Sequence, residues 1–150
     1  MTAMNAALRI STDKHELDVG LVHHFLSTEA YWSCGIPRAT VERAIAGSLC
    51  FGGYLDGRQV AFARVVTDGA TFGYLADVFV LREHRGQGHA RTLMAAVMAH
   101  PRLEGLRRFS LATSDAHELY AAYGFAAPVQ PQSLMEKLDS DVYTRAPGTP

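Results

Sequence analysis

The pattern of apolar residues near the start of the chain predicts a short strand followed by a helix. The strand is expected at residues 7–10. Within residues 15–37, apolar side chains recur every four positions, at Leu17, Leu21 and Phe25. This spacing places them on one helix face. The helix should end before Gly35.

Residues 38–47 predict a second helix. Thr40 is a candidate N-cap, residues 42–46 form the body and Gly47 marks the stop. Both helices therefore precede the main run of strands.

Residues 49–81 predict three strands. The breaks between them fall at Asp56-Gly57 and Asp68-Gly69, dipeptides that accept positive φ angles in tight turns. Short turns of this kind join antiparallel neighbours, so an antiparallel meander is expected.

A third helix is predicted to begin at the glycine-rich turn that follows the meander and to end before Pro101. Its apolar residues follow the spacing of a single face, at Ala90, Leu93, Met94, Val97 and Met98. One side of this helix should pack on the sheet.

The rest of the chain adds a strand at residues 107–113, a short helix at 115–125 and a last strand at 133–138, before a loose tail from about residue 140. Helices and strands alternate without an internal repeat or linker. We therefore expect one domain, residues 1–150, of mixed α/β (α+β) class.

Composition narrows the function classes. A net charge of -1 and the lack of a basic stripe with interleaved aromatics argue against a nucleic-acid or membrane partner. Cys34 and Cys50 are too few for a disulfide scaffold. The start of the chain does not resemble an export signal, and no apolar run reaches the ~20 residues that cross a bilayer, so a cytoplasmic protein is expected.

The turn at residues 85–90 is the strongest candidate for a ligand-binding site. A helix N-terminus offers free N–H groups, and Gly86 and Gly88 would let an anionic group approach without a Cβ in the way. The stretch lacks a Walker lysine, and Arg91 replaces the third glycine of a dinucleotide fingerprint. A phosphate-bearing ligand of another kind is indicated.

Two motifs resemble the GNAT superfamily of acyl-coenzyme A-dependent N-acyltransferases. Residues 85–90, RGQGHA, match its [QR]-x-x-G-x-[GA] motif, and residues 118–125, ELYAAYGF, resemble its L-Y-x-x-x-G-F segment. The resemblance implies acetyl-CoA as co-substrate and a twisted sheet flanked by helices and splayed between residues 72–81 and 107–113. Backbone groups expected at the coenzyme are those of Phe79, Val80, Arg85, Gly86, Gln87, Gly88, His89 and Ala90.

The resemblance also assigns a general acid. Tyr120 falls on the tyrosine that in many relatives protonates the departing thiolate, whereas Tyr123 is expected only to pack. Thr113 stands where the family often has an asparagine, as a coenzyme contact at the splay. A Tyr120 that merely packs its ring is the structural alternative.

Asp77 is the best acidic candidate for the base that takes a proton from the acceptor amine. Strand alternation puts it on the face of Leu75 and Phe79, and relatives often carry a glutamate near this position. A solvent-facing or hydrogen-bonded Asp77 is the alternative.

The resemblance also implies that the acceptor binds at the first helices and their loop, where Tyr31, Trp32 and Ile36 could line a pocket, although aromatic residues at such spacing also occur in cores. The histidines lack metal-ligand spacing, so no metal is expected. The acceptor would be a small-molecule or protein amine, and a homodimer is a possible assembly. A degenerate domain that binds acyl-CoA or a partner without turnover is the alternative, and an amine panel with acetyl-CoA separates the two.

Overall fold

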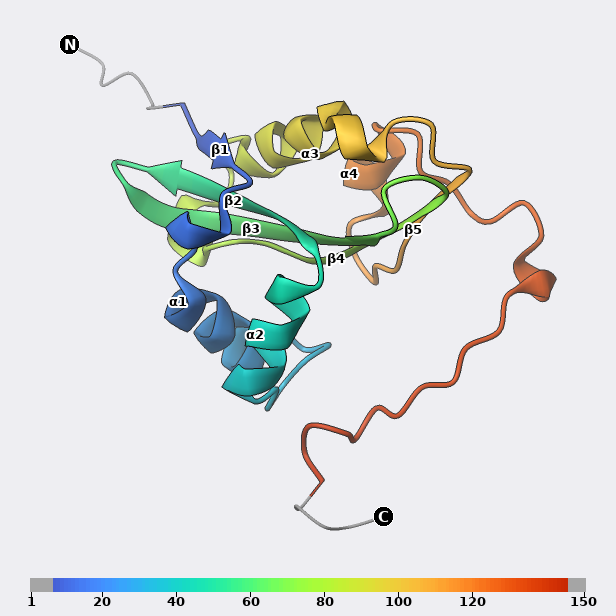
Figure 1. The fold of residues 1–150 in the computed structure, drawn as a ribbon, viewed down its shortest axis with the longest axis horizontal. Coiled ribbons are helices and arrows are strands. Elements are labelled where there is room, and N and C mark those ends of the chain that lie inside the picture. Colours follow the sequence, from blue (N-terminus) through green and yellow to red (C-terminus); the bar gives the residue numbers. More distant parts are fainter. Residues whose placement is uncertain (1–6, 146–150) are drawn as a thin grey trace.

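A computed structural model describes residues 7–145 as one mixed α/β domain built on a five-stranded sheet (Figure 1). The strand order follows the chain, and every neighbouring pair is antiparallel except β4 and β5, which are parallel. The strands are β1 (Arg9–Ser11), β2 (Leu49–Leu55), β3 (Arg58–Thr67), β4 (Phe72–Val80) and β5 (Arg108–Leu111). The meander predicted from the two Asp-Gly turns is confirmed.

Helices cover both faces of the sheet. On one face lie α1 (Val19–His24), the π-helical turn η2 (Phe25–Glu29) and α2 (Arg38–Ala46). On the other lie α3 (His89–Ala99) and α4 (His117–Ala121) (Figure 1). Short 3-10 turns connect these elements: η1 (Lys14–Glu16), η3 (Arg82–His84), η4 (Pro101–Leu103) and η5 (Pro131–Ser133).

Each face buries its own apolar core. The α1–α2 core joins Val22, Phe25, Leu26, Val41, Ile45, Phe62 and Phe79. The α3 core joins Phe51, Ala63, Val65, Leu75, Val80, Leu93, Met94 and Val97. Three of the five residues predicted for the buried face of α3, Leu93, Met94 and Val97, are fully enclosed, whereas Met98 is 38% exposed.

The predicted first helix is shorter than its apolar spacing suggested. The Asp18 carboxylate accepts a hydrogen bond from the Leu21 N–H (3.0 Å) and so starts α1 after Leu17. The helix then widens into the π turn and stops at Glu29, before the predicted limit. Thr40, predicted as a cap, lies inside α2, because Pro37 occupies the capping position.

A bulge in β4 overturns the face predicted for Asp77. Asp77 has a φ of 55°, and the register between β3 and β4 shifts between Phe62 and Arg64. Leu75 therefore points into the α3 core and Phe79 into the α1–α2 core, rather than sharing one face. The extra residue turns Asp77 toward the α1–α2 side.

The strand predicted at residues 133–138 does not form in the described part of the chain. After α4, residues 126–142 run apart from the body as an extended segment, here named the C-terminal arm (Figure 1). The tail expected from about residue 140 then includes Tyr143, which packs against the α1–α2 core.

Within residues 7–145, no helix has the length and apolarity needed to cross a bilayer. The same residues hold no cluster of His, Cys, Asp or Glu suited to a metal ion.

Candidate active site

Strands β4 and β5, the last two of the sheet, part about halfway along β4. Their pairing runs from Phe72–Arg108 to Leu75–Leu111 and ends there, while β4 continues to Val80. A cavity of about 650 Å³ lies at the point of parting. Its lining includes Trp32, Arg64, Asp77, Thr113, Tyr120 and Tyr143. The backbone from Ala76 onward thus has no β5 partner among the described residues and remains open to an added extended chain.

The turn before α3 forms a second hollow, of about 240 Å³, next to the end of β4. Gly86 and Gly88 have φ angles of 76° and 82°, and no atom lies within 4 Å of where a Cβ would stand on either. The N–H groups of residues 86–90 make no backbone hydrogen bond within the described chain. The turn therefore presents free donors to an open space at a helix N-terminus.

Two side chains connect this turn to its surroundings. Arg85 Nε donates to the Val80 carbonyl (2.9 Å), which holds the turn against β4. His89 is 6% exposed, and its Nε2 atom has no partner among the described residues. A buried, unpartnered ring nitrogen beside a hollow is costly unless a ligand satisfies it. Gln87 is exposed at the tip of the turn.

Tyr120 and Tyr123 occupy different environments. Tyr120 is 8% exposed and lines the cavity, and burial, followed by the negative charge of Asp115, raises the pKa of its phenol. The hydroxyl therefore keeps its proton at neutral pH. Tyr123 donates to the Arg91 carbonyl (2.9 Å), so its hydroxyl links the turn after α4 to α3.

Thr113 shapes the start of α4. Its Oγ1 accepts hydrogen bonds from the N–H groups of Asp115 (3.4 Å) and Ala116 (3.1 Å). The residue lines the cavity, where the sequence predicted a coenzyme contact, but its side chain is already engaged by the backbone.

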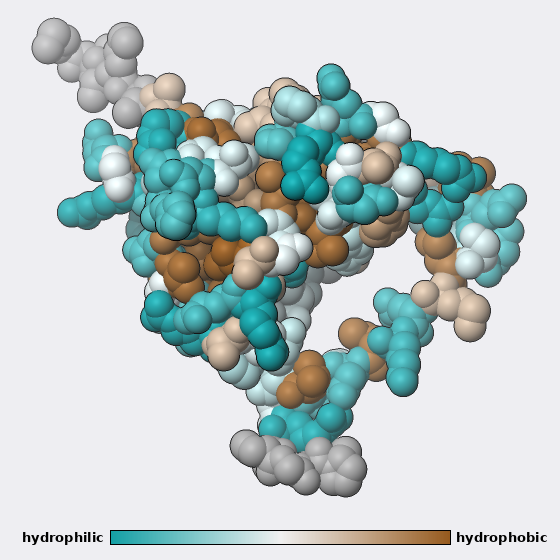
Figure 2. Space-filling view, in the orientation of Figure 1, coloured by the Kyte–Doolittle hydropathy of each residue, from teal (hydrophilic) through white to brown (hydrophobic). Residues whose placement is uncertain are grey.

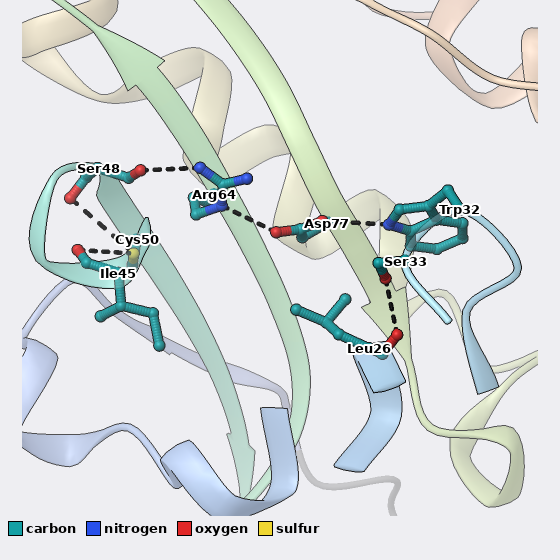
Figure 3. Close-up of polar contacts among 8 residues, drawn as sticks. All are labelled: Leu26, Trp32, Ser33, Ile45, Ser48, Cys50, Arg64 and Asp77. Carbon is teal, nitrogen blue, oxygen red and sulfur yellow. Dashed lines mark hydrogen bonds and ion pairs between the residues drawn. The ribbon is translucent and has the colours of Figure 1, made fainter. Parts of the chain in front are cut away.

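Asp77 is the centre of a polar chain across the α1–α2 side of the cavity (Figure 3). Arg64 Nε donates to Asp77 Oδ2 (2.8 Å), and Trp32 Nε1 donates to Oδ1 (3.1 Å). Arg64 also donates to Ser48 Oγ (3.1 Å). The Arg64 and Asp77 side chains are 18% and 12% exposed, so the ion pair is largely shielded from water. Both carboxylate oxygens of Asp77 are thus held by protein donors.

The three residues expected at the acceptor pocket all line the cavity. Ile36 is buried, whereas Tyr31 and Trp32 are 67% and 44% exposed. The two aromatic rings pack edge to face, 5.1 Å between centroids. Tyr31 Oη and Ser114 Oγ share a hydrogen bond (2.6 Å) that links the first helical region to the loop before α4.

Sequence reasoning missed Arg64, Ser114 and Tyr143 at the cavity. Arg64 left a signal, since it is the one charged residue in the apolar run 60–66, and a charge in a buried strand requires a partner. Ser114 and Tyr143 left none, because they reach the cavity through tertiary packing.

Comparisons with known proteins agree on one family. The acetyltransferase (GNAT) family model matches residues 21–125. A curated Gibberella zeae protein, named as an acetyltransferase, is 34% identical over 133 residues that cover 74% of each chain.

Solved structures share the fold. A Xanthomonas campestris pv. campestris crystal structure, named as a member of the GNAT family, is 61% identical, with a TM-score of 0.91 over 93% of this chain and 99% of that one. A Neisseria gonorrhoeae N-acetylglutamate synthase, solved with coenzyme A and N-acetyl-glutamate, is 20% identical, with a TM-score of 0.63 over 87% of this chain and 31% of that one.

Proposed function

We propose, from the premise that the chain belongs to the acetyltransferase (GNAT) family, that it transfers an acetyl group from acetyl-CoA to a primary amine with Tyr120 as general acid. The observation that carries the proposal is the position of Tyr120. Its phenol lines the cavity where β4 and β5 part, at the far end of an open strand edge that leads from the glycine turn.

The two hollows are joined by β4. Val78 lines the large cavity and Val80 lines the hollow at the turn, with one residue between them. A donor whose phosphates bind the N–H groups of residues 86–90 could pair along residues 78–80 and bring its thioester to the cavity. This path supports a common site for the coenzyme and the reacting carbonyl.

The residues present fit coenzyme A. Gly86 and Gly88 leave the space that a pyrophosphate needs, and free N–H groups supply its hydrogen bonds. The unpartnered Nε2 of His89 provides a further donor or acceptor at the same hollow. Arg85 and Arg91 also line this hollow, so basic side chains stand beside the backbone donors.

The chemistry needs one proton donor at the sulfur. The neutral amine attacks the thioester carbonyl, a C–N bond forms, and the C–S bond breaks as the tetrahedral intermediate collapses. The Tyr120 hydroxyl gives its proton to the leaving sulfur, the nitrogen loses a proton to water, and the phenolate regains a proton from water before the next turnover. A raised phenol pKa keeps Tyr120 protonated for this step.

Asp77 is assigned a positioning role in place of the general-base role expected from the sequence. Both carboxylate oxygens already accept hydrogen bonds, from Arg64 and Trp32. Taking a proton would weaken an ion pair that is largely shielded from water. The carboxylate instead holds the Trp32 ring as a wall of the cavity.

The charges around the cavity favour an amine acceptor that lacks a carboxylate. The charged residues of the described lining are Arg64, Asp77 and Asp115. Arg64 and Asp77 neutralise one another, which leaves the negative charge of Asp115. A cationic small amine would meet this carboxylate and the aromatic faces of Tyr31 and Trp32.

Steady-state turnover of a Tyr120→Phe variant tests the proposal. The ring that packs beside Phe125 stays and only the hydroxyl is lost, so stability and coenzyme A affinity should change little while kcat falls about 10²-fold. A panel of amines with acetyl-CoA, followed by thiol release, first identifies an acceptor.

Tyr123→Phe is the matched control and should retain turnover. Undiminished turnover in Tyr120→Phe would remove the proton-donor role. If no amine in the panel releases thiol although coenzyme A binds, the chain is an acyl-CoA-binding domain without turnover.

A further inference from the structure

Asp115 is the carboxylate of the cavity lining that is left unused by the protein. The acidic residues of the described lining are Asp77 and Asp115, and both oxygens of Asp77 accept hydrogen bonds. Within residues 7–145, the Asp115 carboxylate takes part in no hydrogen bond or ion pair, and the described lining holds no histidine. Asp115 is therefore the basic side chain that remains available at the cavity.

The loop that carries Asp115 is held in place although its carboxylate is free. Thr113 Oγ1 accepts hydrogen bonds from the N–H groups of Asp115 (3.4 Å) and Ala116 (3.1 Å). The Ser114 hydroxyl shares a hydrogen bond with the Tyr31 hydroxyl (2.6 Å). These contacts fix the backbone around Asp115, so the carboxylate is positioned at the cavity without a bond of its own.

Asp115 and Tyr120 occupy paired positions at the start of α4. Ala116 is the N-cap of this helix, so Asp115 precedes the cap and Tyr120 is the fourth helical residue. Side chains at these two positions commonly pack on one another across the first turn of a helix. The Tyr120 N–H donates to the Ala116 carbonyl (3.3 Å) and closes that turn. Because both side chains also line the cavity, the carboxylate and the phenol share one reaction space.

The electrostatic effect of Asp115 on Tyr120 agrees with this placement. Burial, followed by the negative charge of Asp115, raises the pKa of the Tyr120 phenol. A carboxylate that opposes ionisation of the phenol ceases to do so once it has taken up a proton. Proton uptake by Asp115 therefore makes Tyr120 a better acid at the moment when the sulfur leaves.

An acceptor can reach Asp115 from solvent. The residue is exposed, and the C-terminal arm stands clear of the body (Figure 2). An amine arrives mostly as an ammonium ion at neutral pH. Since Arg64 and Asp77 neutralise one another, the ammonium meets the negative charge of Asp115.

We propose that Asp115 takes the proton that the nitrogen loses and passes it to Tyr120, a role that rests on the acetyl transfer proposed above. After the nitrogen attacks the thioester carbonyl, its N–H bond breaks and the Asp115 carboxylate takes the proton. Tyr120 protonates the sulfur as the C–S bond breaks, and the phenolate then takes the proton from Asp115. Carboxylic acids are stronger acids than phenols, so this last transfer is downhill. One proton moves from nitrogen to sulfur, both side chains regain their starting forms, and neither transfer needs bulk water.

Steady-state kinetics of Asp115→Asn across pH test the role. The amide keeps the size of the side chain but cannot take the proton, so kcat should fall roughly 10²-fold and the acidic limb of the kcat profile should disappear. The other titratable groups of the described lining, apart from the paired Arg64 and Asp77, are the phenols Tyr31, Tyr74, Tyr120 and Tyr143. A rise in acceptor KM with kcat and the limb unchanged would mean that Asp115 only attracts the ammonium, and it overturns the proposal.

Glu118→Gln is the matched control. Glu118 is an exposed acid on the same helix, three residues after Asp115, and lies outside the described lining of the cavity. This variant should keep the native kcat and the native acidic limb.

A double variant distinguishes a relay from two separate effects. In a relay, loss of either group interrupts the same proton path, so Asp115→Asn combined with Tyr120→Phe should turn over about as fast as the slower single variant. Separate effects would multiply to a loss of roughly 10⁴-fold, and that result overturns the relay.

The melting-temperature shift with coenzyme A checks folding and donor binding, and it should be the same in Asp115→Asn as in the native protein. Full turnover of Asp115→Asn beside a defective Tyr120→Phe overturns the role of Asp115 and leaves acetyl transfer in place. A native protein that releases no thiol with any amine overturns both.

Discussion

At the scale of single residues, replacing Asp77 tests whether its carboxylate positions Trp32 or takes a proton from the acceptor amine. Asp77→Asn leaves the Arg64 cation without its counter-charge, so the free energy of unfolding should fall by on the order of 1–3 kcal/mol. If Asp77 positions Trp32, the acceptor KM should rise while the acidic limb of the pH–rate profile keeps its place. Steady-state kinetics across pH and urea unfolding measure both.

Glu42→Gln is the control for that experiment, because it breaks the exposed Arg38–Glu42 pair and should change stability by less than about 1 kcal/mol. Disappearance of the acidic limb in Asp77→Asn would restore the general-base role.

At the scale of elements, the N-terminus of α3 should bind the coenzyme through its backbone. Gly88→Val places a branched side chain in the open space of the hollow, at a φ of 82°. A saturating excess of coenzyme A should raise the melting temperature of the native protein by roughly 5–10 °C and that of the variant by almost nothing.

Gly57→Val is the matched control, since its φ is 75° and it also lies in open space, but in the β2–β3 turn. Both valines carry similar backbone strain. An equal coenzyme A response in the two variants would exclude the α3 turn as the pyrophosphate site.

Some of the helices and strands could be predicted from the sequence alone. The meander and α3 were predictable because Asp-Gly turns and a repeating apolar face are local features. The start of α1 depends on the Asp18 cap and its end on a π turn, and apolar spacing records neither. Residues 133–138 have strand composition but lack a neighbour in their own chain, and strand formation requires one.

The candidate site residues also fall into two groups, those that local motifs identify and those whose environment depends on distant parts of the chain. The glycines of the turn and Tyr120 belong to contiguous motifs and could be identified from the sequence. The environment of Asp77 depends on Arg64 and Trp32, which lie 13 and 45 positions away along the chain. Contacts over such separations arise from the fold; they agree with the hydrogen-bonded alternative for Asp77, whereas the shared face predicted for Leu75, Asp77 and Phe79 was wrong.

At the scale of the whole molecule, stability should decline in alkali. Burial raises the pKa of Tyr54 to about 12, and its hydroxyl has no partner among the described residues. The folded state therefore holds a proton that the unfolded chain releases near pH 10. The contribution is complete below pH 10 and is lost as pH rises toward 12.

The free energy of unfolding of the native protein should drop by roughly 1 kcal/mol between pH 9 and pH 11 through this group. Tyr54→Phe should flatten that decline in urea unfolding curves, whereas Tyr123→Phe should follow the native protein. A Tyr54→Phe curve as steep as the native one would assign the decline to other groups.

The bulge at Asp77 makes the effect of a deletion in β4 depend on where the deletion falls. Side chains alternate with a period of two, and the added residue changes which positions, odd or even, point to each layer: Leu75 before it and Val80 after it both reach the α3 core. Loss of one residue here would leave Val80 four positions after Leu75, on the same side of a regular strand, whereas the same loss in a strand without a bulge sends every later position to the other layer. An in-frame deletion of Asp77 should thus keep the division of β4 between the two layers while it removes the partner of Arg64 and Trp32.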